Sequence, residues 1–303
     1  MAERYEMLDR AIQEILDGAG EVAIPRDLEE LVAIAADLRD LPSPEFKQRL
    51  GGLMTTMTSA SVKEVTPYLV VEDVDDLIDF AKDVFGAKET LRTKGGAGGT
   101  HCEIHIGDSK VMMGGGMKLP HGPNLAAMHV FVKDVDAAFA RALEAGATPT
   151  HDVVDQEYGS REGSVRDRWG NHWYIATERG ESYRPKNTKD AMPVFHPKGA
   201  PKLIEFLENA LGAEVLEKYE HGGAIVHAKV RAGDSIVELG EAHGQWQPIP
   251  MMFVVAVDSA DAAFQHAVDA GAKVLDPPSK QPYGRRGAVE DPFGNQWHFM
   301  SEK

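Results

Sequence analysis

The 303 residues suffice for one large domain or two of ordinary size, and 43% hydrophobic with 26% charged residues is the balance of a soluble globular protein. The net charge of −16, without a visible basic patch, excludes nucleic acid as an expected partner, because phosphates are bound by clustered Lys and Arg. The single cysteine, Cys102, excludes an internal disulfide and a thiolate metal cluster, and it favours a cytoplasmic location. The sequence shows no apolar stretch long enough to span a membrane and no signal-peptide core, so we expect no membrane partner.

The first sixty residues carry helical signals. Tyr5–Leu16 is amphipathic, Pro25–Leu41 starts with a proline and carries a Leu/Ile stripe, and Ser43–Leu50 begins with a capping serine. The small polar stretch Thr55–Ser61 follows as a linker. We predict a helical N-terminal arm and linker over residues 1–60 that packs on the rest of the chain or on a second subunit. The oligomeric state stays open, and a homodimer is one option.

From residue 61 onward the chain repeats itself. Three phrases occur twice, in the same order and at nearly constant spacing. They begin at Ile106 and Ala232 (IGDSKVMM, AGDSIVEL), at Val135 and Ala260 (VDAAFARALEAGA, ADAAFQHAVDAGA), and at Tyr158 and Tyr283 (YGSREGSVRDRWGNHW, YGRRGAVEDPFGNQW). Several independent matches in one order indicate an internal duplication.

Each long repeat also contains one plan twice. An apolar strand runs into an acidic turn, a helix with apolar residues at helical spacing ends at Gly-Ala, and short alternating segments with Gly-rich turns follow. The copies are recognised at Val70–Ala87, Val130–Ala147, Pro193–Ala213 and Phe253–Ala272. The sequence therefore predicts an α+β chain of four βαβββ modules.

Four such modules with these phrases resemble the vicinal oxygen chelate superfamily, which includes glyoxalase I, bleomycin-resistance proteins, fosfomycin-resistance enzymes and extradiol dioxygenases. The Tyr158 and Tyr283 loops are similar to those of its PhnB-like branch, and the first departs from that pattern at Glu162 and Arg168. The resemblance implies that modules pair into concave sheets, with helices on the convex face and a ligand in the concave one. We therefore expect two glyoxalase-like domains, residues 61–180 and 190–303.

Strand alternation indicates which side chains face the ligand. In "HCEIHIG", from His101, apolar residues alternate with His and Glu. In "HAKVRAG", from His227, they alternate with His, Lys and Arg, and in "WHFMS", from Trp297, aromatic core residues alternate with His and Met. The expected ligand-binding residues are His101, His105, His129, Tyr174, His227 and His298. The repeated Gly-Asn-x-Trp phrase is then structural, because the Trp is in the core and the residue after it faces the pocket.

The resemblance also implies places for metal ligands. They fall on Thr66, Met112, Ala127, Tyr174, Met192, Glu238, Met252 and His298. Of these, Glu238 and His298 are ligand types suited to a hard divalent ion, so the set is incomplete and we expect no metal cofactor. A variant divalent-metal site of Glu238 and His298 with His227 or His196 stays open. Glu238 and His298 are also the candidate catalytic residues.

The loops after Tyr158 and Tyr283 offer a second kind of contact. These tyrosines, with Arg161 and Arg286, could contact an anionic ligand. We expect instead that each arginine bridges to the aspartate of its own Gly-Asn loop, Asp167 or Asp291, and holds the turn.

Three functions remain in view. The sequence favours a protein that binds a small organic molecule in a concave pocket, and it does not decide whether the protein is an enzyme. The alternative is a metal-dependent lyase, isomerase or transferase with its site in the second repeat, where the metal would polarise a carbonyl or a hydroxyl pair. The third is a regulatory or interaction protein that docks through the helical arm.

Overall fold

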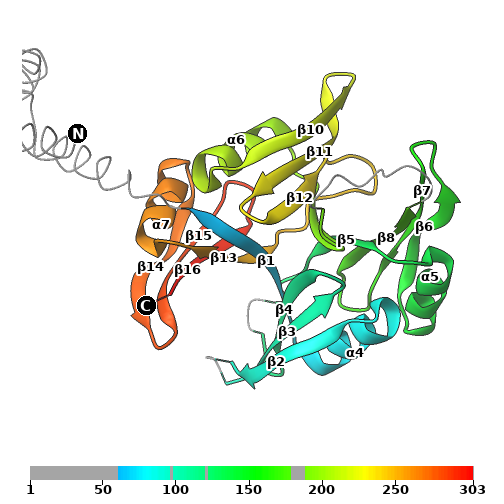
Figure 1. Ribbon diagram of the computed structural model, residues 1–303, viewed down its shortest axis with the longest axis horizontal. Helices are drawn as coiled ribbons and strands as arrows, with labels where there is room; N and C mark the ends of the chain where they lie inside the picture. Colours follow the sequence, from blue (N-terminus) through cyan, green and yellow to red (C-terminus); the bar gives the residue numbers. More distant parts are fainter. Residues whose placement is uncertain (1–60, 96–97, 120–121, 179–187, 303) are drawn as a thin grey trace, which may run out of the picture. The chain divides into compact units, whose positions relative to one another are not determined.

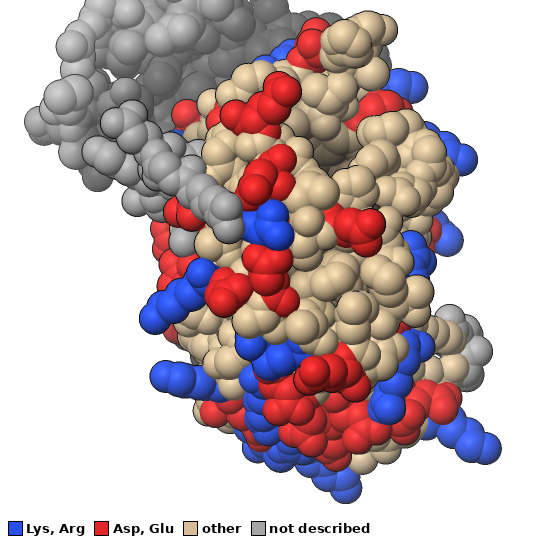
Figure 2. All heavy atoms as spheres, turned by 90° about the vertical axis from the view of Figure 1, so that its right-hand side faces the viewer, with Lys and Arg blue, Asp and Glu red and all other residues tan. Residues whose placement is uncertain are grey.

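The computed structural model describes residues 61–95, 98–119, 122–178 and 188–302 (Figure 1). The predicted helical arm, residues 1–60, lies outside these ranges. Among the described helices none is long and apolar enough to span a membrane. On the face shown in Figure 2, Asp and Glu side chains lie among Lys and Arg side chains, so this face carries no continuous basic patch.

The described chain consists of four βαβββ modules, as predicted. The first contains β1 (Val62–Val71), α4 (Val74–Phe85), β2 (Lys88–Lys94), β3 (Thr100–Ile106) and β4 (Ser109–Gly115). The second contains β5 (Ala127–Phe131), α5 (Val135–Glu144), β6 (Thr148–Asp155), β7 (Ser160–Arg166) and β8 (His172–Glu178). The third contains β9 (Ala191–Phe195), α6 (Ala200–Leu211), β10 (Glu214–His221), β11 (Ala224–Ala232) and β12 (Ser235–Leu239). The fourth contains β13 (Met252–Val257), α7 (Ala260–Asp269), β14 (Lys273–Gln281), β15 (Gly284–Glu290) and β16 (Gln296–Ser301).

The modules pair across the two sequence repeats rather than within them. The first sheet has the order β14-β15-β16-β13-β1-β4-β3-β2, so it joins the first module to the fourth. The second sheet has the order β10-β11-β12-β9-β5-β8-β7-β6 and joins the second module to the third. The antiparallel pairs β1–β13 and β5–β9 make these joins. Residues 61–180 and 190–303 therefore mark the duplicated sequence, whereas each sheet takes one module from each.

The physical reason for this pairing lies outside the local patterns. Each module pairs with another module through the edge of its first strand. This edge is alike in all four modules, so strand alternation and helix capping do not indicate which two modules share a sheet. The repeated Gly-Asp-Ser turns add contacts between the two sheets. Ser235 accepts a hydrogen bond from the Val65 amide of β1, and Ser109 accepts one from the Ala191 amide of β9. Each turn thus binds a strand of the other sequence repeat.

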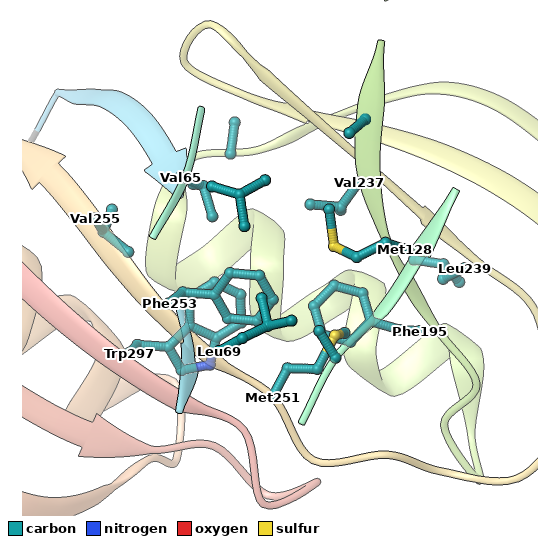
Figure 3. Packing of buried hydrophobic residues seen from close by; sticks show 14 of the residues in the cluster. Val65, Leu69, Met128, Phe195, Val237, Leu239, Met251, Phe253, Val255 and Trp297 are labelled. Carbon is teal, nitrogen blue, oxygen red and sulfur yellow. The ribbon is translucent and has the colours of Figure 1, made fainter. Parts of the chain in front are cut away.

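The main hydrophobic core lies between the two sheets and their helices. Helix α4 contacts α5, and α6 contacts α7, so each helix pair combines one helix from each sheet. Phe195 of the second sheet packs against Phe253 and Trp297 of the first, whose rings are stacked 4.6 Å apart (Figure 3). Burying such large apolar side chains is the main stabilising contribution to the fold.

The repeated Gly-Asn-x-Trp loop is held by its aspartate. Asp167 accepts hydrogen bonds from the amides of residues 169–171, from the Asn171 side chain and from the indole N–H of Trp173. Asp291 holds Phe293, Asn295 and Trp297 in the same way. In both loops the Asn side-chain oxygen accepts an amide hydrogen bond from the segment that leads into the neighbouring strand. The structural reading of this phrase is correct.

The predicted role of the two arginines is wrong. Arg161 pairs with Asp136 and Asp155, and Arg286 pairs with Asp276. The aspartates of the Gly-Asn loops are turned inward, 4% exposed, and their oxygens accept bonds from the loop itself. The arginines therefore bind carboxylates on the more exposed helices and hairpins.

Candidate functional site

A cavity of about 380 Å³ lies on the second sheet. Its lining includes His129, Tyr174, His196, His227, Glu238 and Trp246. A larger, more open groove of about 660 Å³ passes Lys133 and Asp190, but its charged lining residues are exposed or half-buried. Buried titratable groups gather at the cavity on the second sheet, which makes it the candidate site.

Strand register places the central side chains of this cavity. His129 of β5 is opposite Tyr174 of β8, and Glu238 of β12 is opposite Val194 of β9. Since β5 and β9 pair at the middle of the sheet, these four residues surround its centre. His129 lies two residues beyond Ala127, the position of a metal ligand that the resemblance implies. The two positions share a strand face.

His129 and Glu238 form a buried ion pair at the floor of the cavity. His129 Nδ1 is 2.8 Å from Glu238 Oε2, and the two residues are 7% and 3% exposed. Burial opposes charge on Glu238, but His129, His227 and Lys229 outweigh it and lower the pKa of the carboxyl to about 2. Burial also opposes protonation of His129, but Glu238 outweighs it and the pKa of the imidazole is raised. The ring therefore donates its Nδ1–H to the carboxylate, and the ion pair favours the protonated form of the imidazole.

The ion pair continues into a row of alternating charges. Lys229 of β11 has no exposed surface, and its Nζ is 3.0 Å from Glu217 Oε1 and 3.8 Å from Glu238 Oε1. The row Glu217, Lys229, Glu238, His129 thus crosses from the edge strand β10 to the centre of the sheet. A buried lysine needs such partners, because an isolated ammonium in the interior is very costly.

Aromatic and neutral imidazole groups form another part of the lining. The Tyr174 hydroxyl is 2.8 Å from His196 Nε2, and the Tyr174 ring lies 4.3 Å from that of His172. Burial is the main cause that lowers the pKa of His196 to about 4 and raises the pKa of Tyr174. At neutral pH these two groups are therefore uncharged.

The structure separates the residues predicted for the site into two groups. His129, Tyr174, His227 and Glu238 come together on the second sheet. His101, His105 and His298 belong to β3 and β16 of the first sheet. The expected joint site of Glu238 and His298 is therefore wrong, because the pairing of modules places them on different sheets. On the first sheet His298 contacts Arg286, and His101 contacts the Tyr68 hydroxyl.

Strand alternation itself is confirmed on both sheets. Cys102, Ile104 and Ile106 are buried on β3, whereas the alternate residues His101, Glu103 and His105 are half-buried. Lys229 is the informative case. Alternation predicted that Lys229 faces inward. Its complete burial and its partners Glu217 and Glu238 depend on the neighbouring strands β10 and β12. Glu217 and Trp246 carried no local signal in the sequence.

The donor set does not fit a divalent metal ion. The metal candidates Glu238, His298 and His227 are divided between the sheets, and His227 Nε2 faces Glu217 Oε1 at 3.6 Å. His129 and Glu238 bind each other, and the Lys229 ammonium lies beside the second oxygen of Glu238. In the part of the chain that the structure describes, no three His, Cys, Asp or Glu side chains converge as ligands.

The buried His172 predicts acid sensitivity. Its Nε2 lies 2.9 Å from the Thr150 hydroxyl, and burial lowers its pKa from the ordinary 6.5 to about 4. The pKa of His172 is lower in the folded protein than in the unfolded chain. The stability that the neutral His172 ring contributes is therefore present above pH ~6.5 and is lost as the pH falls toward 4. We expect His172 to account for a loss of roughly 2 kcal/mol in the free energy of unfolding between pH 7 and pH 5.

Urea unfolding at both pH values, for the wild type and His172→Gln, measures this contribution. The variant should lose less stability on acidification, since glutamine does not titrate. An equal loss in both proteins would show that His172 is not the titrating group.

Fold and site together define a tandem protein of four βαβββ modules with a ligand-sized cavity on one sheet. The model of the Glyoxalase/Bleomycin resistance protein/Dioxygenase superfamily matches residues 61–175 and 197–299. The chain therefore belongs to this superfamily.

The chain is also similar to other proteins and to solved structures. Uncharacterized proteins of Mycobacterium bovis and Mycobacterium tuberculosis are 34% identical to the chain over 146 residues, which is 45% of this chain and 93% and 84% of those proteins. Glyoxalase I from Zea mays is similar in structure, with a TM-score of 0.63 and 16% identity over 80% of this chain and 92% of that one. A putative dioxygenase from Bacillus subtilis has a TM-score of 0.54 and 13% identity over 80% and 86%. At these identities the structures show the shared fold.

Proposed function

We propose that this protein binds a small organic molecule in the cavity of the second sheet without a metal ion. The observation that carries the proposal is the cavity of about 380 Å³ that combines the buried His129–Glu238 pair with Tyr174 and Trp246. Placed polar groups beside aromatic side chains in a concave site are features of ligand pockets.

The metal-dependent lyase, isomerase or transferase has weaker support. His129 and Glu238 are residue types that can bind a metal ion. The positions opposite them on the neighbouring strands hold Tyr174, a neutral phenol, and Val194, neither of which is a suitable ligand. The regulatory alternative depends on residues 1–60, outside the described ranges.

Two finer assignments accompany the proposal. The loops that begin at Tyr158 and Tyr283 support the PhnB-like branch of the superfamily. The single, buried Cys102 supports a location in the reducing cytoplasm.

Filling the cavity tests the proposal. Val194 is 9% exposed and lines the cavity, so Val194→Phe should place a ring where the ligand binds. Aromatic fragments found by ligand-detected NMR on the wild type should lose at least roughly tenfold in affinity for this variant, because a difference of 1.4 kcal/mol already gives that factor.

The chain offers a matched control. Val254 of β13 is opposite His298, as Val194 is opposite Glu238, but it lies on the first sheet. Val254→Phe should bind the fragments with wild-type affinity. Circular dichroism verifies that both variants are folded. Equal binding by wild type and a folded Val194→Phe would place the ligand elsewhere.

A further inference from the structure

A buried hydrogen-bond donor at the cavity floor has no partner of its own. His129 uses Nδ1 for Glu238, while its Nε2 is buried and makes no hydrogen bond to any described residue. Only 7% of the His129 surface is exposed, and the residue lines the cavity. A buried donor left unsatisfied costs about 1–3 kcal/mol, and more when it is charged. A ligand acceptor in the cavity would remove that cost.

The charges around this donor favour an acceptor that is itself negative. The charges of the row Glu217, Lys229, Glu238 and His129 alternate, and the His129 ring, whose protonated form is favoured, stands at the end nearest the centre of the sheet. His196 and His227 add no charge at neutral pH, because burial lowers the pKa of both. His129 is therefore the positive group of this row that a ligand in the cavity can reach.

One carboxylate acts in the opposite direction. Glu162 of β7 lines the cavity, and its oxygens accept hydrogen bonds from the Tyr158 hydroxyl and from Ser160. It is half-buried on the side of the cavity where Tyr158 is 49% exposed. Water screens a half-buried carboxylate better than it screens the buried floor. A ligand anion therefore gains more at His129 than it loses to Glu162.

We propose that the cavity takes a small aromatic carboxylate, whose anionic oxygen accepts the Nε2 hydrogen bond of His129 and whose ring lies among Tyr174, His196 and Trp246. This assignment rests on the proposed function and names its ligand class. A charge-assisted hydrogen bond of this kind is about twice as strong as a neutral one. The flat apolar body matches the aromatic part of the lining.

The test compares two probes of the same shape, 2-naphthoate and the neutral 2-naphthamide, with the full-length protein at pH 7. We expect naphthoate to bind at least roughly tenfold more tightly, as a hydrogen bond to a charged group implies. His129→Gln should abolish that preference, and Glu162→Gln should increase naphthoate affinity by removing the opposing charge. His101→Gln, on the first sheet, should leave both affinities unchanged.

Dissociation constants come from protein-detected NMR titrations, which also locate each probe. Because His129→Gln can weaken the fold, a second measurement uses the wild type: long-range ¹H–¹⁵N spectra should show both His129 nitrogens protonated at pH 7. Equal affinities for the two probes at the cavity, or a neutral His129 ring, would overturn the carboxylate assignment and leave the binding proposal standing. If neither probe perturbs the cavity residues, the proposed function falls as well.

Discussion

Asp167→Ala should lower the free energy of unfolding by about 3–5 kcal/mol. The change removes the acceptor of five donors, three of which are buried, and each buried donor left unsatisfied costs about 1–3 kcal/mol. The donors are three consecutive amides, the Asn171 side chain and the indole of Trp173, and Trp173 has no exposed surface. Urea unfolding followed by circular dichroism measures the change.

Two further variants make this prediction specific. Asp291→Ala removes the acceptor of four donors in the equivalent loop and should have an effect of similar size. Asp152→Ala, at an exposed position on β6, should stay within about 0.5 kcal/mol of the wild type. A loss below about 1 kcal/mol for Asp167→Ala would mean that the loop does not need its carboxylate.

Glu238→Ala should destabilise the protein by about 3–5 kcal/mol, the range for breaking a buried ion pair from one side. The variant removes one of the carboxylates beside Lys229 and the partner that raises the pKa of His129. The cost therefore arises from the charges that remain rather than from lost packing. Chemical unfolding of the variant measures it.

A double-mutant cycle separates this pair from its surroundings. The double variant Glu238→Gln/His129→Gln should be more stable than the sum of the two single changes, because it leaves no half of the pair behind. Glu214→Ala, which breaks a surface pair with Arg231 on the same hairpin, should cost less than about 1 kcal/mol. Additive single changes would show that His129 and Glu238 are not energetically coupled.

Local patterns in the sequence predicted the elements because local physics forms them. The helix after Asp134 is capped by that side chain, the helix after Val74 ends at the left-handed Gly86, and both lie in predicted modules. Strand alternation correctly predicted that His101 and His298 lie on one face of their strands and that their apolar neighbours lie on the other. The duplicated Gly170 and Gly294 hold the same place, before the last strand of a module, with positive φ in both.

The sequence by itself thus determined four βαβββ modules, their inward faces and the structural role of the Gly-Asn-x-Trp loops. Only the tertiary structure decided which modules share a sheet, and with that which polar side chains meet. Glu238 faces His129, 109 residues away, rather than His298 of its own repeat. The reason is that capping and alternation act over a few residues, whereas strand pairing joins edges that are chemically alike in all four copies. The site depends on that pairing, because its charged row needs strands from two modules to bring it together.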